Sequence, residues 1–142
     1  MFHTQAQSEN YSHGITRSFI DDGRIVLVET EGDMSRNAIN TWASLLVLTM
    51  QEWPTERPLA ILHDLTHPAQ GLTPFARERT ADVVKARPDG LVVYNAVLLP
   101  PTFIKQIIGM FLRIPLLQKD GQYMKVFSDK DKAIAWLREK IS

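Results

Sequence analysis

One apolar run that leads into a helix start constrains the fold of this chain more than any other feature. The run covers Leu59–Leu65 and ends in the polar tip Asp64-Leu65-Thr66. Shortly after it, the Thr73 hydroxyl can cap a helix, and Pro74 suits the first helical position because its missing N–H would be unpaired there. The pattern predicts a buried strand that feeds a helix through a short polar loop. In α/β folds such loops lie at the carboxyl edge of the sheet, where ligands and partners dock.

Strands and helices alternate along the rest of the chain. β-forming residues on both sides of Asp21-Asp22-Gly23 predict a hairpin, and apolar residues at helical spacing predict helices. The sequence therefore predicts an α/β domain with a mixed, mostly parallel sheet, an N-terminal antiparallel hairpin and about four flanking helices. The expected strands are Ile15–Ile20, Arg24–Thr30, Leu59–Leu65, Leu91–Leu98 and Met124–Phe127, and the expected helices are Ser35–Trp53, one capped by Thr73, Thr102–Arg113 and one capped by Ser128.

Composition fits a single soluble domain of 142 residues. Sixteen basic residues balance sixteen acidic ones, which argues against a dedicated nucleic-acid binder. The absence of cysteine excludes disulfides and thiolate chemistry and fits the cytoplasm. Residues 1–13 are polar and are expected to be a disordered or frayed tail without a secretory signal, and 14–142 are expected to form the domain. No membrane span is expected, because Lys105 and Arg113 interrupt the best apolar run.

Two short motifs accompany this order of elements. Asp64-Leu65-Thr66 ends a strand and Gly71-Leu72 precedes the next helix, and the chain closes with Val126-Phe127-Ser128-Asp129 and Ala133-Ile134-Ala135-Trp136-Leu137. In this order and in these motifs the chain resembles the STAS family, the sporulation anti-anti-sigma factors. The resemblance implies a mixed sheet flanked by helices and a non-catalytic regulatory role that is exerted by binding a protein partner.

One position departs from the family pattern. In members that are switched by phosphorylation, the serine next to the glycine accepts phosphate from a kinase-like anti-sigma partner. Gln70 stands at that position here, after Pro68 and Ala69, and an amide cannot accept phosphate. We therefore expect an interaction module that phosphorylation does not switch. The expected partner-binding loop comprises Asp64, Thr66, Gln70, Gly71 and Thr73.

The residue types that suit a metal site gather at the end of the central strand, but their spacing does not. His63 and Asp64 are successive strand residues, whose side chains point to opposite faces, so a hydrogen-bonded histidine in the core or at the sheet edge is the favoured interpretation. Asp64 is expected to accept N–H bonds in its own turn, since no Gly-rich phosphate loop accompanies it. We expect no metal, no cofactor and no catalytic activity. We also expect no nucleic-acid binding, because basic residues of the second helix are not interleaved with exposed aromatics.

The expected helix Thr102–Arg113 is apolar nearly all round, with Lys105, Gln106 and Arg113 as its only polar positions. A surface helix normally has one apolar stripe, so this one needs cover on most sides. Three alternatives could bury this helix: the chain's own Leu116-Leu117 segment, a second subunit in a homodimer, or a lipid-like ligand. The last would suit an alternative function, binding an apolar small molecule or lipid, which the related fold of CRAL-TRIO lipid-transfer domains supports. The expected apolar contact surface comprises Phe103, Ile107, Ile108, Phe111 and Leu112.

Overall fold

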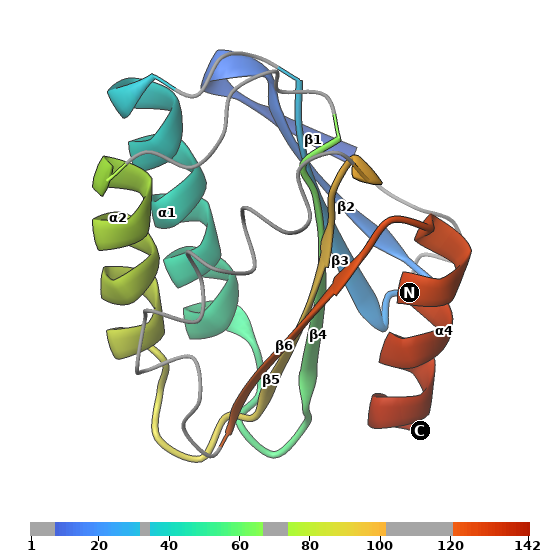
Figure 1. Ribbon diagram of the computed structural model, residues 1–142. Helices are drawn as coiled ribbons and strands as arrows, with labels where there is room; N and C mark the ends of the chain where they lie inside the picture. The colour runs from blue at the N-terminus through green and yellow to red at the C-terminus, as the bar shows by residue number, and fades with distance from the viewer. Residues whose placement is uncertain (1–7, 32–34, 67–73, 102–120) are drawn as a thin grey trace.

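The structure of the protein is a computed structural model that describes residues 8–31, 35–66, 74–101 and 121–142. These residues form a six-stranded sheet and three α-helices (Figure 1). The predicted α/β class is confirmed, while the fourth expected helix, at Thr102–Arg113, lies outside the described residues. The elements are β1 (Ser8–Tyr11), the 3-10 turn η1 (Ser12–Gly14), β2 (Ile15–Ile20), β3 (Ile25–Thr30), α1 (Arg36–Glu52), β4 (Leu59–Asp64), α2 (Pro74–Lys85), β5 (Val93–Leu98), β6 (Gln122–Phe127) and α4 (Lys130–Ile141).

The sheet is mixed, as predicted, and its spatial order is β1-β2-β3-β4-β5-β6. The pairs β1–β2 and β2–β3 are antiparallel, and the pairs β3–β4, β4–β5 and β5–β6 are parallel. The hairpin between β2 and β3 turns through Asp21, Asp22 and Gly23, whose φ angles are 56°, 58° and 80°. Aspartate and glycine are the residue types that adopt this left-handed backbone most readily, which explains why this sequence places the turn here.

Helices cover both faces of the sheet: α1 and α2 pack on one face and α4 on the other (Figure 1). Successive strand residues supply the two cores alternately. Val26 and Ile61 belong to the cluster that includes α1, whereas Leu27 and Leu62 belong to the cluster that includes α4. Because both faces are buried, the parallel strands are almost continuously apolar, which is what made them visible in the sequence.

The first strand was not expected from the sequence. β1 (Ser8–Tyr11) lies within the segment 1–13 for which a frayed tail was predicted, and it pairs antiparallel with β2. Its side chains are mostly exposed, so it lacks the alternating apolar pattern of a core strand. The guanidinium of Arg17 on β2 helps to hold it, because Nε donates to Glu9 Oε1 at 2.7 Å. On its other side Arg17 Nη1 donates to Thr49 Oγ1 at 2.9 Å and to Glu52 Oε1 at 3.2 Å, both on α1.

The helix starts follow local capping rules, with one correction. Ser35 caps α1 by accepting a bond from Ala38 N at 3.2 Å. The prediction that Ser128 caps the last helix is wrong, because the side chain of Asp129 accepts bonds from Asp131 N and Lys132 N. The cap lies one residue later because α4 starts at Lys130, and aspartate is as good a cap as serine.

A glycine sets the entry into β6. Gly121 has a φ of 91°, and a Cβ atom placed on it would lie 2.8 Å from Arg87 Nη1. That guanidinium follows α2 in the chain and donates to the carbonyl oxygen of Leu91 at 2.6 Å. The backbone angle therefore favours glycine at this position, and any larger residue would also displace the guanidinium of Arg87.

Candidate functional site

The carboxyl end of β4 forms a braced turn. Asp64 is 6% exposed, and its Oδ1 accepts from the backbone N of Thr66 at 3.1 Å and from Thr66 Oγ1 at 2.6 Å. On the neighbouring strand, Thr30 Oγ1 donates to the carbonyl oxygen of Asp64 at 3.3 Å. The turn is the Asx type predicted for this aspartate. The carboxylate thus has a structural task, which fixes the direction in which the chain leaves the sheet.

The starts of two helices lie at the same edge of the sheet (Figure 1). α1 follows β3 and α2 follows β4, so both begin where those strands end. The guanidinium carbon of Arg36, the first residue of α1, lies 4.6 Å from the ring centroid of Phe75 on α2. This cation–π contact joins the two starts and is partly exposed. The braced turn of Asp64 and Thr66 and the Arg36–Phe75 pair together form what we call the carboxyl-edge surface.

The structure brings together two of the expected loop residues, Asp64 and Thr66. The other three, and the five residues of the expected apolar contact surface, lie outside the described residues. The roles expected for these residues stay predictions. The residues concerned are Gln70, Gly71, Thr73, Phe103, Ile107, Ile108, Phe111 and Leu112.

His63 is a core histidine, one of the two placements that the sequence analysis favoured. Its Nε2 lies 2.9 Å from Asn95 Oδ1, and Asn95 Nδ2 donates to the carbonyl oxygen of Tyr123 at 3.2 Å. Since the amide nitrogen of Asn95 is committed to Tyr123, its oxygen accepts from His63, whose Nε2 therefore carries the proton. Burial lowers the pKa of His63, and the bond to Asn95 opposes this only in part, so the ring is neutral near pH 7. Within the described residues, no cluster of three or more His, Asp or Glu side chains that could hold a metal is found.

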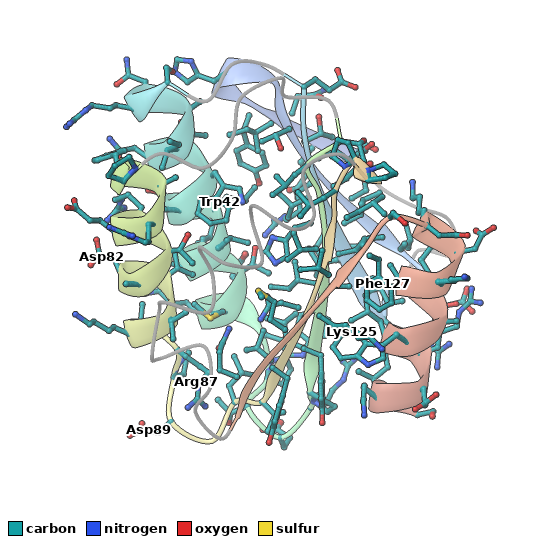
Figure 2. The ribbon with its side chains drawn as sticks, viewed as in Figure 1. Trp42, Asp82, Arg87, Asp89, Lys125 and Phe127 are labelled. Atoms are coloured by element: carbon teal, nitrogen blue, oxygen red, sulfur yellow. The ribbon has the colours of Figure 1, made fainter. Side chains whose placement is uncertain are left out.

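A small pocket lies beside this histidine, between the sheet and the helices α1 and α2. Its volume is about 50 Å³ and its walls are mainly aliphatic. Trp42 projects from α1 toward the sheet (Figure 2), with its ring centroid 6.3 Å from that of His63. Trp42 Nε1 and Gln122 Oε1 line the pocket region without a hydrogen-bond partner in the described part of the chain. A buried donor and a buried acceptor are thus left unsatisfied around one cavity, which is unusual in a folded protein.

Sequence reasoning missed this cluster because it depends on strand register. In the β4–β5 pair Ile61 lies opposite Asn95 and His63 opposite Val97, so the two polar side chains are diagonal neighbours on one face. The signal in the sequence was the interruption of two apolar strands by single polar residues, His63 and Asn95. Their meeting could be inferred only once the register was known.

Comparisons with known proteins find the fold but no sequence relative. No family model and no curated protein matches the chain. A solved structure, the crystal structure of an anti-sigma factor antagonist from Mycobacterium paratuberculosis, matches with a TM-score of 0.55 and 11% identity. The match covers 94% of this chain and 93% of that one. The chain therefore has the STAS-like fold that its sequence resembled, and at this identity the likeness extends to the fold alone.

No helix in the described ranges is both long and apolar enough to cross a membrane.

Proposed function

We propose that this protein is a non-catalytic regulatory module of the STAS-like type that binds a protein partner through the carboxyl-edge surface. The observation that carries the proposal is the fold shared with an anti-sigma factor antagonist. The fixed turn at Asp64 supports it, because a preorganised surface loses less conformational entropy on binding. The partner-binding loop would continue through Gln70, Gly71 and Thr73. The partner class would be an anti-sigma factor, and Gln70 would leave the complex insensitive to that partner's kinase activity.

Binding to purified anti-sigma proteins encoded in the same genome tests this proposal. Calorimetric titration, with and without ATP, should find one of them that binds equally well in both conditions. Thr66→Arg places a bulky charge at the exposed edge and should weaken that binding by about tenfold or more, a loss of about 1.4 kcal/mol or more. The matched control is Thr55→Arg, another exposed threonine, in the turn between α1 and β4.

Two outcomes would contradict the proposal. One is an equal loss for Thr66→Arg and Thr55→Arg, which would place the interface elsewhere. The other is a partner that transfers phosphate to this protein, seen as a mass increase of one phosphate, with loss of binding.

A second function, binding an apolar small molecule, is favoured by the pocket beside His63. Its walls are mainly aliphatic, and within the described residues the indole N–H of Trp42 and the amide oxygen of Gln122 have no hydrogen-bond partner, which suits a ligand that is apolar apart from one acceptor and one donor. The size limits the ligand strictly. A cavity of about 50 Å³ is a third of the ~150 Å³ cavity that holds benzene in a protein core. A lipid chain would fit only if the pocket widened.

Retained mass on freshly purified protein tests this alternative. Native mass spectrometry should detect an added small molecule on the wild type, and Gln122→Leu should abolish it by removing the acceptor. Gln51→Leu, at an exposed position on α1, is the control and should retain the ligand. A wild type without added mass would count against this function.

A further inference from the structure

We propose that the groove between β6 and α4 binds a small, flat aromatic anion such as an aromatic carboxylate. The groove lies along β6 beside α4, its volume is about 520 Å³, and it shares Gln122 and Met124 of that strand with the pocket beside His63. That volume falls in the usual range for small-molecule sites, about 300–1,000 Å³. The occupant is inferred from the rings and charges that line the groove.

Aromatic rings form one wall. The rings of Tyr94 on β5 and Tyr123 on β6 are stacked, with centroids 5.2 Å apart and planes at 18°. The rings of Trp136 on α4 and Tyr94 form a T-shaped pair, with centroids 6.2 Å apart and planes at 83°. Each ring is thereby held in place by another. Tyr123 nevertheless remains 42% exposed, a large exposed fraction for a ring in a groove. A flat ligand stacked against this wall would cover apolar surface that is otherwise in water.

Two uncompensated cations supply the charge complementarity. Lys125 and Lys140 line the groove, and neither forms an ion pair with any residue that the structure describes. Among the described lining residues none is acidic. Lys125 Nζ lies 5.5 Å from the ring centroid of Phe127, and both side chains project on the α4 side of the sheet (Figure 2). An anionic group on the ligand would therefore pair with the ammonium group of Lys125 or of Lys140 beside an aromatic wall.

The charge of the whole chain favours a small ligand over single-stranded nucleic acid. Stacked rings with lysines also occur in proteins that bind single strands, but those proteins add a basic surface that follows the backbone. This chain carries sixteen basic and sixteen acidic residues. Two lysines in one groove suit one anionic group better than a polyanion.

The test compares naphthoate with its neutral isostere naphthamide, using the full chain and NMR correlation spectra. Naphthoate should bind and shift the indole N–H signal of Trp136, and naphthamide should bind about tenfold more weakly because it cannot pair with the lysines. Lys125→Gln or Lys140→Gln should weaken naphthoate binding by about tenfold. Tyr123→Leu should weaken both probes by about two- to tenfold.

Lys132→Gln is the matched control, since it removes the same charge from α4 outside the groove. It should leave naphthoate binding unchanged. The proposal is overturned if naphthoate does not bind at millimolar concentration, if the amide binds as tightly as the acid, or if Lys132→Gln weakens binding as much as the groove variants. Displacement of naphthoate by an oligothymidylate that binds more tightly would assign the groove to nucleic acid instead.

Discussion

Single residues decide two properties of this protein, the buried polarity beside β4 and the backbone path into β6. Beside β4, burial keeps His63 neutral, and the ring bonds to Asn95. Before β6, Gly121 has a positive φ angle that other residue types avoid. Sequence reasoning favoured a core or edge histidine at 63 over a metal ligand, because His63 and Asp64 point to opposite faces of the strand, and the structure places His63 in the core. The need for glycine at 121 was not visible, since Arg87 approaches it from a distant part of the chain.

Acid should destabilise the protein through His63. The folded-state pKa of this ring lies below its ordinary value of 6.5, so the unfolded chain binds the proton first as the pH falls. The stability contributed by the neutral ring is complete above pH 6.5 and is lost below it, with a slope of up to about 1.4 kcal/mol per pH unit. Urea unfolding across this range should find a shallower slope for His63→Gln. His13→Gln removes an exposed histidine and should keep the slope of the wild type; equal slopes in all three proteins would contradict the prediction.

Alanine at two glycines should separate backbone strain from steric contact. Gly90 and Gly121 both have positive φ, but a Cβ meets nothing within 4 Å at Gly90 and meets the guanidinium of Arg87 at Gly121. Gly90→Ala should therefore lower the free energy of unfolding by only about 1–2 kcal/mol, the strain of a left-handed backbone at alanine. Gly121→Ala should cost about 0.5–1.5 kcal/mol more, because Arg87 must leave the carbonyl of Leu91.

The comparison is made by urea unfolding. In an Arg87→Ala background the difference between the two glycine variants should shrink, since the steric partner is gone. If the difference stays the same, the contact with Arg87 does not explain the larger loss of stability in Gly121→Ala.

Secondary-structure elements were predicted well where local pattern determines them and missed where long-range contacts do. In α2, for example, the buried residues Ala76, Thr80, Val83 and Val84 recur at helical spacing along the sequence. β1 was missed because its four residues carry no apolar alternation, and it is held by pairing with β2 and by Arg17. The same division holds for the site. The turn of Asp64 is local and was predicted, whereas the His63–Asn95 pair depends on register and was not.

Arg17 should be the residue that keeps β1 on the sheet. Its side chain is 7% exposed and bonds to β1 and α1 together, so Arg17→Met should lower the free energy of unfolding by about 1–3 kcal/mol. Hydrogen exchange should become faster at the amides of β1 than elsewhere. Arg24→Met is the control, because Arg24 is 46% exposed and its ion pair with Asp21 should contribute at most about 1 kcal/mol. Unchanged exchange in β1 after Arg17→Met would show that backbone pairing alone holds the strand.

At the scale of the whole molecule, the sequence and the fold lead to one open question, the number of subunits. The expected helix Thr102–Arg113 carries more large apolar side chains than one stripe can bury, and isologous pairing is the commonest way to cover such a surface. We therefore predict a homodimer in native mass spectrometry and sedimentation. Phe111→Glu should yield monomers, whereas Leu48→Glu, at an exposed leucine of α1, should leave the dimer intact. A wild type that is monomeric and free of ligand at all accessible concentrations would rule out this interface.

The order of the strands across the sheet is also their order along the chain. During synthesis, every strand from β2 onward emerges next to an edge that already exists, and none has to insert between two formed neighbours. Pairing can thus proceed from the N-terminal hairpin outward, first through the short hairpin turn between β2 and β3 and then across the longer crossover connections that join the parallel strands. The final strand is the one that completes the wall of rings and lysines. On a ribosome, therefore, the strands β1 to β5 would be assembled before the groove between β6 and α4 exists, and the proposed ligand would find no site there until both elements had been made.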